Sequence, residues 1–188
     1  MLKIGRYFAS LLLFLSMSSV LVSNSYGKGY KGFKLLNPDE CSQLDKKVVS
    51  QLPVEWHKYA DFVKICKLKE KGNTDAKVSI ISIWINDYYD TTVPTGAPHI
   101  WENFPLTLIV DSNLHIIGKL PEIYPMNDIT SPDVYYGKWK SGIPTEIRID
   151  VNNPAVEGDY YYSPLIWDIK SLNYKMKSKE VTYGRRPK

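Results

Sequence analysis

Residues 106–120 read LTLIVDSNLHIIGKL and contain the clearest hairpin signal in the 188-residue chain. Two apolar runs, 106–110 and 114–120, flank an Asp-Ser-Asn stretch at 111–113, and these three residue types are typical of turns. This arrangement predicts two antiparallel strands joined by a tight turn. An antiparallel sheet is therefore the first expectation for the fold.

Residues 145–151 strengthen that expectation because apolar and polar side chains alternate strictly. A strand turns successive side chains to opposite faces, so this pattern predicts a half-exposed strand. Further strands are expected near 160–167 and 174–177. The apolar face of the alternating strand would carry Ile147, Ile149 and Val151, and the polar face would carry Glu146, Arg148 and Asp150.

A second hairpin is expected upstream. Residues 63–69 alternate loosely, the segment 72–75 (Gly-Asn-Thr-Asp) is typical of a turn, and residues 77–85 form a β-branched run. The competing interpretation is a helix from Glu55 to Lys67, since several aromatic and apolar residues there also fall near helical spacing.

A short amphipathic helix is expected at the front of the mature chain. Asn37 fits the N-cap, Pro38 fits the first helical position, and Glu40 stands at the capping-box position. Pro53 would end the helix. The buried stripe would follow helical spacing through Cys41, Leu44, Val48 and Leu52.

Cys41 and Cys66 are the only two cysteines. In an oxidising compartment an even number favours one disulfide, here between residues 25 positions apart, and this bond would tie the front helix to the first strand. Two free buried thiols are the alternative. Several short strands, twelve prolines and one helix then predict a single α+β domain over 28–178. The expected architecture is an N-terminal amphipathic helix disulfide-tied to a mainly antiparallel β-sheet or sandwich, followed by a flexible basic tail at 179–188.

Residues 1–27 are typical of a secretory signal peptide. Lys3 and Arg6 precede an apolar stretch over 7–22, and a small-x-small exit follows at Ser25 and Gly27. Cleavage is expected after Gly27, with Ser25 as the near alternative. An uncleaved anchor is disfavoured because the uninterrupted apolar core is shorter than the ~20 residues of a spanning helix. The sequence therefore predicts a periplasmic or secreted protein without stable membrane insertion.

Charge is distributed unevenly along the mature chain. Residues 28–77 carry eleven basic and seven acidic groups, residues 78–169 carry four and twelve, and residues 170–188 carry seven and one. The middle therefore has a net charge of −8 between basic flanks of +4 and +6. Nucleic-acid grooves interleave aromatics with Lys and Arg, whereas the aromatics here fall mostly in the acidic part. A nucleic-acid partner is not expected.

The acidic middle also contains clusters of tyrosine and tryptophan, among them the Tyr pairs at 88–89, 135–136 and 160–162. Consecutive tyrosines in a strand point to opposite faces, so each pair is expected to place at least one ring outward. Exposed aromatic rings beside carboxylates are typical of protein-binding surfaces, although each ring could instead pack into the core. The expected contact region consists of Asp87, Tyr88, Tyr89, Asp90, Trp101, Glu102, Asp159 and Tyr161.

Signals for an enzyme are sparse. The chain contains no G-x-S-x-G, no H-E-x-x-H and no C-x-x-C motif, and its three histidines are scattered. No cofactor and no metal site is expected. A carboxylate pair such as Asp87 with Asp90 or Glu102 leaves glycoside chemistry open, because the separation that tests it is spatial.

Together these features predict a non-enzymatic, exported protein-binding protein of the inhibitor or immunity type. Its acidic, Tyr- and Trp-rich surface would occlude a partner protein, such as an exported toxin or hydrolase, through electrostatically steered docking. The alternative hypothesis is a small cell-envelope hydrolase or a module that binds glycan or peptidoglycan. Cell-wall glycan is the less favoured partner.

Overall fold

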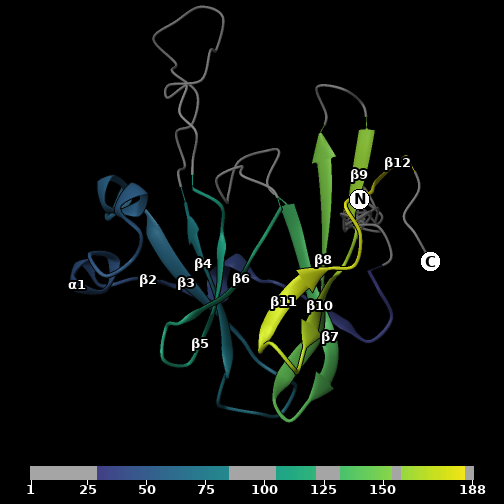
Figure 1. Ribbon diagram of the computed structural model, residues 1–188, viewed down its shortest axis with the longest axis horizontal. Helices are drawn as coiled ribbons and strands as arrows, with labels where there is room; N and C mark the ends of the chain where they lie inside the picture. The colour runs from purple at the N-terminus through teal and green to yellow at the C-terminus, as the bar shows by residue number, and fades with distance from the viewer. Residues whose placement is uncertain (1–28, 85–104, 122–131, 154–157, 185–188) are drawn as a thin grey trace, which may run out of the picture.

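The computed structural model describes residues 29–84, 105–121, 132–153 and 158–184, and the remaining residues stay outside the description (Figure 1). Within these ranges the chain forms two antiparallel β-sheets and three short helical segments. No helix among them is long and apolar enough to cross a membrane. The expected antiparallel architecture is therefore confirmed, whereas the signal peptide expected at 1–27 lies outside the described residues.

The first sheet has five strands in the order β2-β3-β4-β5-β6. Each neighbouring pair in this sheet is antiparallel and consecutive in sequence, and the β3–β4 and β5–β6 pairs are hairpins. The strands are β2 (Cys41–Gln43), β3 (Val63–Leu68), β4 (Val78–Ile83), β5 (Leu108–Asp111) and β6 (Ile116–Lys119).

The second sheet has seven strands, with the central order β1-β7-β8-β10-β11. β9 also pairs with β8, along the same edge as β10 but nearer the end of β8, and β12 pairs with β9. The strands are β1 (Phe33–Leu35), β7 (Pro132–Lys140), β8 (Ile143–Asn153), β9 (Gly158–Tyr162), β10 (Leu165–Asp168), β11 (Asn173–Met176) and β12 (Val181–Tyr183).

The two sheets pack face to face around the main core. Apolar side chains of β3, β4, β5 and β6 meet those of β7, β8, β10 and β11 there. Gly118 in β6 permits the close approach, because a Cβ atom at this position would lie 3.0 Å from the Cβ of Tyr174. The fully buried members of the core include Leu68, Ile80, Ile109, Tyr136, Ile147 and Ile149.

A second core covers the other face of the five-stranded sheet. Helices α1 (Lys46–Val49) and η2 (Val54–Tyr59) place Val49, Trp56 and Tyr59 against that face. Every residue of β4 is consequently buried, which explains why four of its six residues are Val or Ile. Figure 1 shows the resulting three layers: helical segments, five-stranded sheet and seven-stranded sheet.

The single front helix expected over residues 38–52 is wrong. Asn37 does cap a helical turn, η1 (Pro38–Glu40), by accepting a hydrogen bond from the Asp39 backbone N–H, but the chain then becomes extended as β2. A separate one-turn helix, α1, begins after Asp45, whose side chain accepts from the Lys47 backbone N–H. Sheet pairing with β3 supplies the backbone partners of residues 41–43, so tertiary contact overrides the local helical pattern.

Both expected hairpins are confirmed, and so is the disulfide. β3 pairs with β4 and β5 with β6, so the competing helix over 55–67 is limited to η2. Cys41 lies directly opposite Cys66 in the β2–β3 register, and the two form a disulfide. The bond therefore joins two neighbouring strands, instead of a helix and a strand as expected.

The alternating strand exists as β8, with Ile147, Ile149 and Val151 buried in the main core. Its polar face is not half-exposed as expected, because Glu146 and Asp150 are only 5% and 6% exposed. The segment that contains Tyr30 and Phe33 covers this face. The Tyr30 hydroxyl donates to Asp150 at 2.6 Å, and the Arg148 guanidinium lies 4.3 Å from the centre of the Tyr30 ring.

The C-terminal part also differs from expectation. Residues 179–188 were expected to form a flexible tail, but within them residues 181–183 form β12, which pairs with β9. The Tyr183 ring packs edge to face on Tyr160, with the ring centres 5.0 Å apart. This aromatic contact and the β12–β9 ladder hold the segment against the sheet despite its polar sequence.

The sandwich has two distinct ends. β4, β6 and β8 finish at one end, where β5, β7 and β9 begin, and we call it the connection end (Figure 1). The opposite end, here the turn end, carries the tight turns of four hairpins. These turns lie at residues 69–77, 112–115, 141–142 and 169–172.

Candidate functional site

Only two of the eight residues expected in the contact region lie among the described residues. These are Asp159 and Tyr161, both on β9 at the connection end. The Tyr161 hydroxyl donates to the Asp159 carboxylate at 3.0 Å, and the Tyr161 side chain is only 6% exposed. Tyr161 therefore presents no exposed ring to a partner, contrary to expectation. The six residues outside the description are Asp87, Tyr88, Tyr89, Asp90, Trp101 and Glu102.

The expected outward rings are also absent from the described pair on β7. Tyr135 and Tyr136 do face opposite sides of the sheet, yet they are 5% and 0% exposed. Tyr30 packs edge to face on Tyr135 with the ring centres 5.1 Å apart, so the N-terminal segment covers the outer ring. Alternation assigned the faces correctly, but it does not show which face another segment covers.

The acidic residues of β8 form a buried ion-pair network. Glu146 accepts hydrogen bonds from Lys138 Nζ at 2.5 Å and from Arg148 Nε at 2.6 Å. Burial alone would raise the pKa of Glu146, but these two cations outweigh it and hold the pKa below its ordinary value. Part of the negative charge in the chain's middle is thus neutralised inside the fold and is not available to steer a partner.

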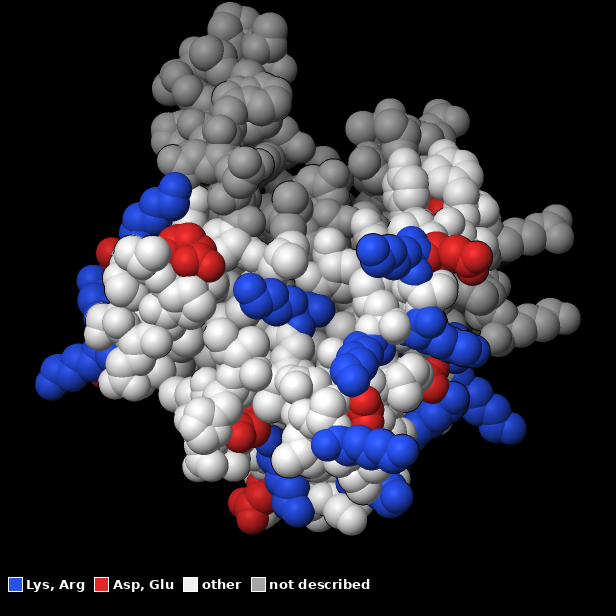
Figure 2. Space-filling model, viewed as in Figure 1, with Lys and Arg blue, Asp and Glu red and all other residues white. Residues whose placement is uncertain are grey.

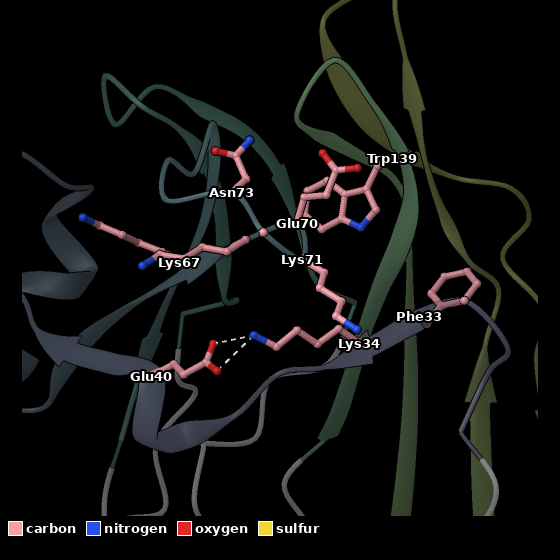
Figure 3. Close-up of a pocket in the computed structure, with 11 residues that line it drawn as sticks. Phe33, Lys34, Glu40, Lys67, Glu70, Lys71, Asn73 and Trp139 are labelled. Carbon is pink, nitrogen blue, oxygen red and sulfur yellow. Dashed lines mark hydrogen bonds and ion pairs between the residues drawn. The ribbon is translucent and has the colours of Figure 1, made fainter.

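A cleft opens at the turn end, between the two sheets. It has a volume of about 900 Å³ and lies between the β3–β4 turn and strands β1 and β7. We call it the basic cleft, because four of its eleven lining residues are lysines and two are glutamates. The lining residues are Gly32, Phe33, Lys34, Glu40, Lys67, Lys69, Glu70, Lys71, Gly72, Asn73 and Trp139 (Figure 3).

One lysine and one glutamate of the basic cleft neutralise each other. Lys34 Nζ donates to both carboxylate oxygens of Glu40, at 2.7 and 3.0 Å. These hydrogen bonds raise the pKa of Lys34 and keep it protonated. Lys67, Lys69 and Lys71 remain against Glu70, so the lining has a net charge of +2. Figure 3 shows Lys71 extending from the turn toward β1, while Lys67 points outward.

Trp139 enters the basic cleft because of an unusual backbone conformation at its neighbour. Lys138 has a φ of 54°, in the left-handed region, which costs a non-glycine residue ~1–2 kcal/mol. The alternation of β7 is interrupted there: Lys138 reaches Glu146 on the outer face, whereas Trp139 packs edge to face on Tyr136, with the ring centres 5.9 Å apart. The ion pair with Glu146 thus stabilises the conformation that turns Trp139 inward.

A buried hydroxyl without a partner lies beneath the basic cleft. The Tyr136 hydroxyl is fully buried, and no residue in the described ranges forms a hydrogen bond with it. Burial raises the pKa of Tyr136, while Lys34 and the Lys69 backbone oppose the rise. Because Lys34 and Lys69 both line the cleft, the hydroxyl lies directly behind the cleft wall.

Two of the three histidines lie among the described residues. The His57 ring contacts the Leu52 carbonyl at 2.9 Å, and His115 pairs with Asp111 at 3.1 Å, so each has a structural partner. In the part of the chain that the structure describes, no group of three or more His, Cys, Asp or Glu side chains could hold a metal ion. His99 and the carboxylates considered for glycoside chemistry lie outside that part.

Sequence reasoning did not identify the basic cleft. Lys67 and Lys69 belong to the strand expected at 63–69, and Lys71, two positions further on, was given no role. Lys34 and Trp139 are distant along the chain and join them only through strand pairing. Lysines at alternate positions that continue into a turn were the available signal, because alternate residues of a strand project from the same face.

Comparison of the chain with protein-family models, with curated proteins and with solved structures found no match.

Proposed function

We propose that the protein is an exported, non-enzymatic binding protein of the inhibitor or immunity type, and that its partner docks at the connection end. One observation supports this location. The three connections 85–104, 122–131 and 154–157 join strand ends that all lie at this end, and together they carry six Asp or Glu residues and no Lys or Arg. A basic partner surface would be attracted to such an end.

The rest of the molecule has the opposite charge. The described residues contain eighteen Lys and Arg against fourteen Asp and Glu, a net charge of +4, and two of those acids are the buried Glu146 and Asp150. Figure 2 shows basic side chains outnumbering acidic ones on the face in view. A molecule polarised in this way would orient an approaching basic protein toward the connection end before contact.

Export is the second part of the proposal. The Cys41–Cys66 disulfide is of the kind that persists in oxidising compartments. It agrees with the secretory features of residues 1–27. A periplasmic or secreted location would give the protein access to an exported toxin or hydrolase as its target.

A charge-reversal experiment tests the docking site. The mature protein would serve as bait in periplasmic extract, and the captured partner would be identified by mass spectrometry and purified. We expect the variant with Asp87→Lys, Asp90→Lys and Glu102→Lys to associate at least ten-fold more slowly at low salt. The difference should shrink as salt rises, because screening weakens steering.

A matched variant controls for net charge. Glu55→Lys, Asp75→Lys and Glu180→Lys reverse three exposed acids that lie outside the three connections, and they should leave the association rate within about two-fold. Equal slowing in both variants would contradict a localised docking site. Release of fragments from peptidoglycan by the wild-type protein would instead favour the hydrolase hypothesis.

A further inference from the structure

The basic cleft at the turn end is unrelated to the proposed docking site, because it lies at the opposite end of the sandwich. Three of its lysines, Lys67, Lys69 and Lys71, form no ion pair within the described residues. Lys67 lies on β3, which is held by pairing with β4 and by the disulfide at Cys66, and Lys69 and Lys71 lie in the turn that follows. The cleft therefore offers a positioned positive charge to a ligand.

The opposite wall offers a flat apolar surface. Trp139 is half-buried, and its orientation is set by the edge-to-face contact with Tyr136 and by the left-handed Lys138. An indole ring held in place can pack against a planar or ring-shaped part of a ligand with little loss of side-chain entropy. Asn73 and Glu70 on the rim can exchange hydrogen bonds with hydroxyl groups.

The Tyr136 hydroxyl is buried behind the cleft and has no hydrogen bond of normal geometry among the described residues, although Lys34 and the Lys69 backbone lie near it. Buried polar groups normally have a hydrogen-bond partner, so each exception calls for an explanation. This hydroxyl lies behind Lys34 and Lys69, two residues of the cleft wall. A small movement of the flexible Lys34 side chain, which is 43% exposed, would open it to a group bound in the cleft.

We propose that the basic cleft binds an anionic saccharide, with its acidic groups on Lys69 and Lys71 and a sugar ring against Trp139. The volume of about 900 Å³ is within the usual range for small-ligand sites. A saccharide matches both a single aromatic wall and a rim that can hydrogen-bond hydroxyl groups. A nucleic acid would be expected to use several stacking rings and a uniformly basic groove, and Glu70 interrupts such a groove.

Titration calorimetry on the mature protein tests the proposal with defined probes. Trigalacturonate supplies carboxylates, a heparin-derived tetrasaccharide supplies sulfates, and chitotriose is a neutral sugar. A peptide of six glutamates represents an acidic protein segment. We expect at least one anionic saccharide to bind ten-fold or more tightly than chitotriose and the peptide, with an affinity that falls as salt rises.

Two variants with matched charge locate the binding. Lys69→Gln with Lys71→Gln should weaken binding at least ten-fold, whereas Lys47→Gln with Lys177→Gln, outside the cleft, should change it less than two-fold. Tyr136→Phe should weaken binding at least three-fold while leaving the fold intact. Trp139→Phe should also weaken binding at least three-fold. If this variant does not fold, the comparison of the two lysine variants still tests the proposal.

Several outcomes would overturn the proposal. The first is that neither anionic saccharide binds, and the second is that chitotriose binds as tightly as they do. The others are that the acidic peptide binds more tightly than the saccharides, or that both lysine double variants weaken binding equally. The test is separate from the one for the proposed function. Reversal of Asp87, Asp90 and Glu102 should leave saccharide binding unchanged, so each proposal can fail without the other.

Discussion

Tyr136 and Tyr174 belong to the same buried core, but only one of their hydroxyl groups has a hydrogen-bond partner among the described residues. Tyr174 donates to the Pro144 carbonyl at 2.5 Å, whereas the Tyr136 hydroxyl is buried without a partner. Burial raises the pKa of both phenols, so both are neutral at physiological pH. The two side chains therefore differ in how their polar atoms are satisfied, which gives them different roles in stability.

We predict that Phe substitution will have opposite consequences at these two positions. Tyr174→Phe should lower the free energy of unfolding by about 1 kcal/mol, because it removes a hydrogen bond and leaves the Pro144 carbonyl without its donor. Tyr136→Phe should be neutral or slightly stabilising, since it removes a buried hydroxyl that has no bond to lose. Urea unfolding of the two variants would measure both effects. A larger loss for Tyr136→Phe than for Tyr174→Phe would contradict this assignment.

The disulfide gives a second prediction. Replacing Cys41 and Cys66 by Ser should lower the free energy of unfolding by about 3 kcal/mol, because the bond closes a 25-residue loop in the unfolded chain. Guanidinium unfolding would measure the difference. The double Ser variant should be insensitive to reductant, whereas the wild-type protein should fall to the same stability when reduced. An unchanged wild-type midpoint in reductant would argue against the bond.

Much of the fold could be predicted from local patterns. Turn residues between apolar runs identified the hairpins at 63–83 and 106–120, and strict alternation identified β8. The front helix was mispredicted because the sequence Cys41–Gln43 is compatible with two structures. It fits a helix in which Cys41 lies on the apolar stripe, and it also fits an edge strand. Pairing with β3 decides between these two states, and no pattern within the segment itself contains that information.

The candidate site could not be predicted for a related reason. The buried state of Glu146 and Asp150 depends on Tyr30 and Phe33, more than a hundred residues earlier in the chain. Net charge along the sequence could not distinguish these neutralised acids from exposed ones. The basic cleft likewise requires β1 and β7 to meet the β3–β4 turn, a contact between segments far apart in sequence.

The β7–β8 turn supplies a third prediction. Its two central residues, Ser141 and Gly142, have φ values of 52° and 76°, as a type I′ hairpin turn requires. Gly142→Ala should lower the free energy of unfolding by about 1 kcal/mol, because a side chain is strained in this region. Ser141→Asn should raise it by roughly 0.5 kcal/mol, since Asn tolerates left-handed backbone better. Thermal unfolding would show shifts of opposite sign, and shifts of the same sign would contradict the turn type.

The final prediction concerns Glu146 and acid stability. Glu146→Gln should lower the free energy of unfolding at pH 7 by about 2 kcal/mol, because the charge-assisted hydrogen bonds from Lys138 and Arg148 are lost. The exposed Lys34–Glu40 pair, with side chains 43% and 41% accessible, provides the control. Glu40→Gln should change stability by less than about 0.5 kcal/mol, since solvent screens an exposed pair.

The pH dependence distinguishes an ionic role for Glu146 from a packing role. Its folded-state pKa lies below the ordinary value, so its stabilising charge is fully present above the unfolded-state pKa and is lost as pH falls through the folded-state pKa. The stability difference between wild type and Glu146→Gln should therefore be largest near neutral pH and should shrink below about pH 5. Urea unfolding at several pH values would measure it. A difference that stays constant down to pH 3 would show that Glu146 contributes through shape and not through charge.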